Sequence, residues 1–101
     1  MNIVTVQELK SKLDANQNVH LIDVREPHEN AVFNIGGTLF PLGKIQTMQI
    51  DDIEDLRNEE VVVYCRSGMR SMQACMILQQ LGFTNVSNLQ GGMVEWEATF
   101  K

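Results

Sequence analysis

Cys65 opens the segment whose residue types and spacing most clearly favour chemistry. It follows the β-branched run 61–64, which is typical of a buried strand, and it precedes a segment with helical periodicity. The loop between them contains Arg66, Ser67, Gly68, Met69, Arg70 and Ser71. Gly68 permits a tight turn, which lets consecutive backbone N–H groups point inward at the start of the helix. We therefore expect this loop to bind an anion.

Such a setting predicts a reactive thiolate at Cys65, because N–H groups, the helix dipole and nearby cations lower the pKa of a thiol. The alternative is that Cys65 is a small packing residue. Cys75 lies in the middle of the following helix beside its apolar stripe, and we expect it to pack in the core. Ser71 either caps this helix or faces the anion. Arg25, two residues after Asp23, is expected to form a structural ion pair.

Composition excludes several other kinds of site. The net charge is −5, whereas nucleic acid or an anionic membrane calls for a basic surface. Two cysteines are too few for a disulfide framework, and no CxxC motif or His/Cys cluster indicates a metal. His20 and His28 are isolated and are expected to pack or lie on the surface. No secretory signal and no run of about 20 apolar residues is found, so the cytoplasm is the expected location.

The elements that must position Cys65 alternate between strand and helix along all 101 residues. A capping box at Thr5 and Glu8 predicts a helix over residues 6–14. Strands are predicted over 19–24, 61–64 and 86–89, an edge strand over 38–42, and further helices near 27, 51, 70–81 and 93–98. This alternation predicts a single α/β domain over residues 1–101, with a mostly parallel sheet that binds ligands at its carboxyl edge.

Four segments, in order along most of the chain, resemble the rhodanese family: LIDVREPHEN, NIGGTLFPL, VVVYCRSGMRS and LGFTNVSNLQGGMVEW. The resemblance implies the rhodanese-like three-layer fold, a five-stranded, mainly parallel sheet flanked by helices. It also implies a sulfurtransferase that needs no cofactor. Cys65 would take sulfane sulfur from thiosulfate or a similar donor, carry it as a persulfide and pass it to a thiol or to cyanide.

By the same resemblance, the backbone from Arg66 to Ser71 would stabilise the persulfide, and the Arg66 and Arg70 side chains would attract the anionic donor. Three alternatives stay open. Cysteine-dependent phosphatases use a similar loop, but their spacing is one residue longer than the four residues that separate Cys65 from Arg70. The others are a binding module that has lost the chemistry, and a sulfur relay with a dedicated protein partner. The physiological donor and acceptor are not predicted.

Overall fold

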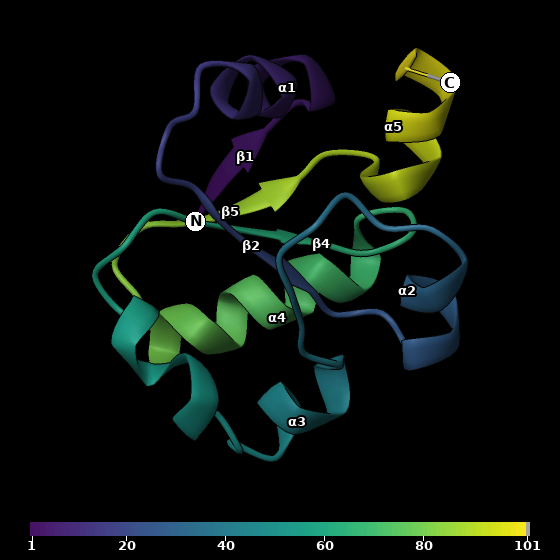
Figure 1. Ribbon diagram of the computed structural model, residues 1–101. Coiled ribbons are helices and arrows are strands. Elements are labelled where there is room, and N and C mark those ends of the chain that lie inside the picture. The colour runs from purple at the N-terminus through teal and green to yellow at the C-terminus, as the bar shows by residue number, and fades with distance from the viewer. Residues whose placement is uncertain (101) are drawn as a thin grey trace.

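Strands and helices alternate as the sequence predicts, and helices cover both faces of one sheet (Figure 1). The computed structural model describes residues 1–100. The strands are β1 (Asn2–Val4), β2 (His20–Asp23), β3 (Thr38–Leu39), β4 (Val61–Tyr64) and β5 (Val86–Leu89). The helices are α1 (Val6–Asp14), α2 (Pro27–Val32), α3 (Leu42–Gln46), α4 (Met69–Gln80) and α5 (Gly92–Phe100), with a 3-10 helix, η1, over Asp51–Leu56.

The five strands lie in the order β1-β5-β4-β2-β3, and every neighbouring pair is parallel. The five-stranded α/β fold implied by the sequence is therefore confirmed. In the central strand β4, Val61 and Val63 pack in one hydrophobic cluster, whereas Val62 and Tyr64 pack in another. All four residues are buried, because both faces of the strand are covered. This double burial explains why β4 is a continuous apolar run and not an alternating one.

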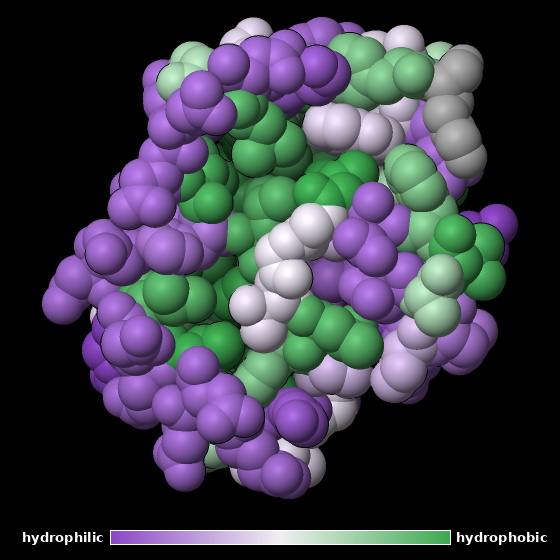
Figure 2. All heavy atoms as spheres, viewed as in Figure 1, coloured by the Kyte–Doolittle hydropathy of each residue, from purple (hydrophilic) through white to green (hydrophobic). Residues whose placement is uncertain are grey.

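The sheet separates the two clusters, with α1 and α5 on one side and α3 and α4 on the other (Figure 1). Figure 2 shows hydrophobic side chains gathered in the middle of the viewed face and hydrophilic residues along its margin. Because all strands are parallel, their carboxyl ends lie at the same edge of the sheet. The loop after β4 therefore leaves the sheet beside the ends of β2 and β5.

The first helix begins as predicted. The Thr5 hydroxyl oxygen accepts a hydrogen bond from Glu8 N–H (3.1 Å), and the Glu8 carboxylate accepts one from Thr5 N–H (2.9 Å). These reciprocal bonds confirm the capping box and satisfy donors that a helix start leaves free. Within residues 1–100, no helix has both the length and the apolar character needed to cross a membrane.

Two predictions about the strands were wrong in detail. The expected edge strand over 38–42 is only Thr38–Leu39, because Pro41 is the N-cap of α3 and the helix begins at Leu42. Proline has no N–H for a strand ladder, and its fixed φ suits a helix start. The sequence predicted no strand over residues 2–4, where β1 pairs with β5. This edge strand has three residues and its Ile3 side chain is exposed, so it lacks the apolar run of a buried strand.

Candidate active site

Cys65 lies directly after β4, and the start of α5 holds it in place. Met93 N–H donates to the Cys65 carbonyl oxygen (2.9 Å), and Val94 N–H donates to that of Arg66 (2.9 Å). Gly92 makes this approach possible, since a Cβ added there would lie 2.4 Å from the Cys65 carbonyl oxygen. The Gly-Gly turn before α5 therefore lets a helix begin against the end of the central strand.

Residues 66–71 turn back around the Cys65 sulfur. Cys65 Sγ accepts hydrogen bonds from the backbone N–H groups of Gly68 (3.1 Å) and Ser71 (3.3 Å). The Ser71 hydroxyl oxygen also lies 3.3 Å from Sγ. Gly68, with φ of 99°, is the N-cap of α4, and this left-handed conformation favours glycine. The loop and the first turn of α4 thus direct their N–H groups at the sulfur.

Opposing influences act on the pKa of the Cys65 thiol. Burial is the largest single one and raises the pKa, since a thiolate loses hydration there. The Ser71 hydroxyl lowers it when its hydrogen points at the sulfur, and the N–H groups of Ser71, Gly68 and Ser67 also lower it. Together these hydrogen bonds outweigh burial, so the pKa of Cys65 lies below its ordinary value and the thiolate forms more readily.

Cys75 has different surroundings. Its side chain is fully buried on α4 within the cluster that contains Val61 and Val63. Burial raises the pKa of the Cys75 thiol to about 12. A thiol of that kind stays protonated at neutral pH and is a poor nucleophile. The packing role predicted for Cys75 is therefore confirmed.

Asn88, on β5, supports the loop from the neighbouring strand and was missed by the sequence analysis. Its side chain is 3% exposed; Nδ2 donates to the Gly68 carbonyl oxygen (3.2 Å), and Oδ1 accepts from the Ser71 hydroxyl (2.5 Å). These contacts span 20 and 17 residues, so they depend on the pairing of β5 with β4. The sequence signal that could have identified Asn88 is its polar side chain in a strand that is otherwise buried. A buried amide requires polar partners, which points to a nearby polar site.

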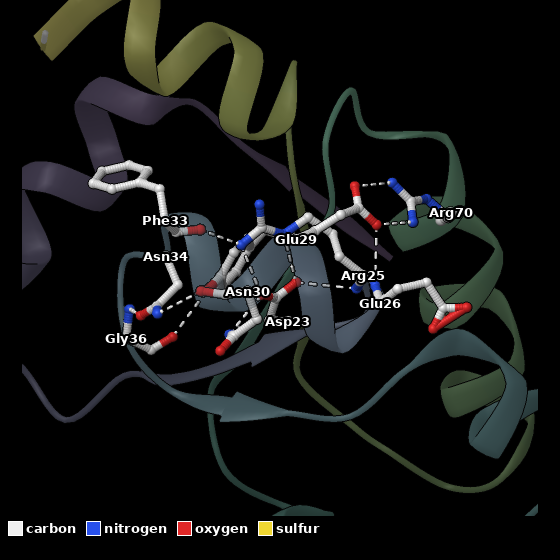
Figure 3. Close-up of polar contacts among 10 residues, drawn as sticks. Asp23, Arg25, Glu26, Glu29, Asn30, Phe33, Asn34, Gly36 and Arg70 are labelled. Atoms are coloured by element: carbon white, nitrogen blue, oxygen red, sulfur yellow. Dashed lines mark hydrogen bonds and ion pairs between the residues drawn. The ribbon is translucent and has the colours of Figure 1, made fainter.

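The two arginines of the loop have different partners. Arg70, in the first turn of α4, forms a bidentate ion pair with Glu29 of α2, with nitrogen–oxygen distances of 2.8 and 3.0 Å (Figure 3). The hydrogen bond from Arg70 lowers the pKa of Glu29 to about 2, so the carboxylate stays charged. Arg66 is exposed and makes no ion pair with any residue in the range 1–100. Arg66 is therefore the loop cation that is free to meet an anion.

A buried ion pair holds α2 beside this loop. Arg25 donates from Nε to Asp23 Oδ1 (2.9 Å) and from Nη2 to Oδ2 (2.9 Å), and the two residues are 6% and 0% exposed. Arg25 Nη2 also donates to the carbonyl oxygen of Phe33 (2.7 Å), and Asn30 Nδ2 donates to Asp23 Oδ2 (2.9 Å), as Figure 3 shows. The structural ion pair predicted for Arg25 is confirmed, and it fixes the helix that carries Glu29.

Two grooves flank the loop. The first, of about 380 Å³, lies between α2 and α5, and we call it the α2–α5 groove. Its lining consists of Arg25, His28, Glu29, Val32, Phe33, Arg66, Met93, Val94 and Glu97. The second, of about 280 Å³, is lined by the exposed loop residues Ser67 and Met69, by Gly68, and by Ile3, Met72, Asn88, Gln90 and Gly91. Both grooves share a wall with the Cys65 loop.

The arrangement around Cys65 suits nucleophilic chemistry on sulfur. A thiol of lowered pKa lies among fixed N–H donors, which favour negative charge on the sulfur or on an atom bonded to it. Within residues 1–100, no group of three or more His, Cys, Asp or Glu side chains is placed to hold a metal ion. Cys65, Gly68 and Ser71 meet directly, and Ser67 contributes its backbone N–H, although Ser67 and Met69 are both exposed.

Known proteins resemble this chain along nearly its whole length. A family model described as rhodanese-like domain matches residues 5–99. A sulfurtransferase of Allochromatium vinosum is 35% identical, covering 95% of this chain and 88% of the relative. Human thiosulfate:glutathione sulfurtransferase is 30% identical, covering 92% and 90%. The crystal structure of a rhodanese-like domain protein from Staphylococcus aureus superposes with a TM-score of 0.83 at 30% identity, covering 95% of this chain and 91% of that one.

Proposed function

This chain belongs to the rhodanese-like domain family, and we propose that it transfers sulfane sulfur by way of a persulfide on Cys65. Relatives named sulfurtransferase support the transferase role. The observation that carries the mechanism is the position of Cys65 Sγ. Cys65 is buried directly after the central strand, and its sulfur accepts hydrogen bonds from the backbone N–H groups of Gly68 and Ser71. The proposed donor is thiosulfate or a similar anion, and the proposed acceptor is a thiol or cyanide.

The first half-reaction is a displacement at sulfur. The Cys65 thiolate attacks the outer sulfur of thiosulfate, a new S–S bond forms, and the S–S bond of the donor breaks. Its electron pair leaves with sulfite, so that Cys65 carries a persulfide anion. In the second half-reaction an acceptor thiolate or cyanide attacks the outer sulfur, and the Cys65 thiolate is the leaving group. Charge and atoms balance in both steps, so the cycle needs no outside oxidant or reductant.

The loop backbone supports both charged states of the sulfur. The N–H groups of Gly68 and Ser71 are fixed by the turn and by α4, and they need no rearrangement when charge moves outward onto the persulfide. The other N–H groups at the start of α4 and the positive end of its dipole lie on the same side. The same donors therefore favour the thiolate before the reaction and the persulfide after it.

We further propose that a thiol acceptor approaches through the α2–α5 groove. Its volume of about 380 Å³ lies within the range of sites that hold small organic ligands. Val32, Phe33 and Val94 give it an apolar side, and Arg66 places a cation next to Cys65. A thiol of small-peptide size that carries a carboxylate matches both features. Cyanide is much smaller, so its reaction with the persulfide would not require contacts with the residues that line the groove.

Donor use should respond in opposite directions to two charge changes near Cys65. The family resemblance implies that both Arg66 and Arg70 attract thiosulfate, but Arg70 is paired with Glu29. Arg66→Gln is expected to lower kcat/KM for thiosulfate by about three- to tenfold, because it removes the free cation. Glu29→Gln is expected to raise it by about two- to fivefold, because it releases Arg70 while an amide oxygen still accepts the Glu26 N–H. Initial rates at low ionic strength measure both values.

Salt and substrate charge provide the controls for these two variants. Both effects should shrink as ionic strength rises, since screening weakens long-range attraction to exposed charge. The rate of the second half-reaction with cyanide at saturating thiosulfate should change less than kcat/KM for thiosulfate. A loss of kcat/KM in both variants, independent of salt, would contradict the distinction between Arg66 and Arg70.

Intact mass tests the proposed function directly. After incubation with thiosulfate and removal of the excess, the protein should gain the mass of one sulfur atom, and cyanide should remove it. The same preparation is assayed for hydrolysis of an aryl phosphate, which a cysteine-dependent phosphatase would catalyse. Phosphate release without sulfur uptake would overturn the proposal. An unchanged mass with no hydrolysis would favour a binding module instead.

A further inference from the structure

The Ser71 hydroxyl lies between two groups that compete for its single hydrogen. Its oxygen is 3.3 Å from Cys65 Sγ and 2.5 Å from Asn88 Oδ1. Asn88 Oδ1 has no hydrogen of its own, so a hydrogen bond between these two oxygens requires the hydroxyl to donate. A hydroxyl that donates to Asn88 presents only lone pairs to the sulfur. In that state it accepts the hydrogen of a thiol and gives a thiolate no support.

The orientation of the Asn88 amide is determined by its other contact. Nδ2 donates to the Gly68 carbonyl oxygen at 3.2 Å, and the side chain is buried. Turning the amide over would place Oδ1 against that carbonyl, so two acceptors would face each other without a hydrogen. Asn88 therefore presents its oxygen, and not its NH₂ group, to Ser71. The Gly68 carbonyl also accepts Met72 N–H (3.2 Å) and keeps this partner if Asn88 is replaced.

The three side chains form an ordered chain of hydrogen bonds when Cys65 is a thiol. The thiol donates to the Ser71 oxygen, the Ser71 hydroxyl donates to Asn88 Oδ1, and Asn88 Nδ2 donates to the Gly68 carbonyl. Once Cys65 loses its proton, the hydroxyl stabilises the sulfur only by turning away from Asn88. That turn leaves a buried amide oxygen without a partner, which opposes ionisation.

We propose that Asn88 is a positioning residue that holds the Ser71 hydroxyl hydrogen away from Cys65 and thereby limits how readily the thiolate forms. The inference concerns the nucleophile of the proposed sulfur transfer and rests on that function for its biological meaning. The backbone N–H groups of Gly68 and Ser71 cannot rotate away and support the thiolate in either case. Asn88 acts through Ser71. Because of Asn88, the Ser71 hydroxyl accepts a hydrogen bond from the thiol, and it must turn away from Asn88 before it can donate one to the thiolate.

Other charged groups lie near the Cys65 loop and are the same in every variant compared. These are Arg66 in the loop, Arg70 on α4, Glu26 at the N-cap of α2, Glu29 on α2, and Glu97 on α5. Because Cys75 is a second thiol, the test is made in a Cys75→Ala background. The readout is the rate of Cys65 alkylation by iodoacetamide as a function of pH, which involves no sulfur transfer.

Two substitutions of Asn88 should move this pH profile in opposite directions. Asn88→Leu removes the acceptor and frees the hydroxyl, so alkylation at pH 7 should be about three- to tenfold faster, with the profile displaced to lower pH. Asn88→Asp provides a stronger acceptor and a negative charge, so alkylation should be slower by a similar factor. A merely structural role would change both variants in the same direction, and that result would overturn the proposal.

A double-mutant cycle with Ser71 completes the test. In a Ser71→Ala background the hydroxyl is gone, so Asn88→Leu should no longer accelerate alkylation. The same acceleration with and without the hydroxyl would also overturn the proposal. If either variant of Asn88 does not fold, Asn88→Ala with its own Ser71→Ala cycle decides the question. Intact mass after thiosulfate treatment is measured separately, so a failure of sulfur uptake is distinguishable from a failure of this inference.

Discussion

Cys65→Ser should lower sulfur transfer from thiosulfate by at least about a thousandfold, because the reaction has no other covalent carrier. An alcohol at this position cannot form a persulfide, and its pKa is far too high for the loop to generate an alkoxide at neutral pH. The N–H groups of Gly68 and Ser71 would still surround the side chain, so folding should be little affected. Initial rates with cyanide, together with intact mass after thiosulfate, measure the loss.

Cys75→Ser is the matched control, since it makes the same substitution on the other cysteine. We expect it to keep most of the activity and to gain one sulfur as the parent protein does. Its cost should fall on stability, because a hydroxyl is buried in an apolar cluster, at about 1–3 kcal/mol in the free energy of unfolding. An equal loss of transfer in both variants at a temperature where both are folded would contradict the separate roles of the two thiols.

The sequence predicted the parts of this fold that depend on neighbouring residues. The capping box joins Thr5 and Glu8, which are only three residues apart in the sequence. The apolar run Val61–Tyr64 identifies a strand buried on both faces. The place of Cys65 at the carboxyl end of that strand followed from the same run. Such features depend on local geometry and on burial alone, which is why they can be read before any tertiary contact is known.

The sequence could not predict the contacts that join distant segments around Cys65. The ion pair of Arg70 with Glu29 spans 41 residues, so the positive charge of Arg70 is already paired with a carboxylate. The bonds of Asn88 depend on β5 lying beside β4, which the order of segments along the chain does not specify. A single sequence shows that these residues are polar, but the choice of partner requires the packed sheet.

Arg25 is an intermediate case. Its closeness to Asp23 in the sequence predicted an ion pair, but it did not predict that the pair is buried. Asp23 is fully buried at the end of β2, and its two oxygens accept two hydrogen bonds from the Arg25 guanidinium, one from Arg25 N–H and one from Asn30. Arg25 also lies over the ring of Tyr64, 5.6 Å from its centre. The pair therefore connects β2 with α2 and with β4, inside the core at the edge that holds the active site.

Asp23→Ala should consequently be among the most destabilising single substitutions in the chain, at about 3–5 kcal/mol in the free energy of unfolding. The loss arises because Arg25, which is 6% exposed, keeps its charge but loses its carboxylate partner, and not because the pair itself is strongly favourable. Asp14→Ala removes the partner of Lys10 in an exposed pair and should cost about 0.5 kcal/mol or less. Urea denaturation of both variants measures the difference. Similar costs in the two would mean that Arg25 reaches water when Asp23 is absent, and α2 would then have to move away from the Cys65 loop.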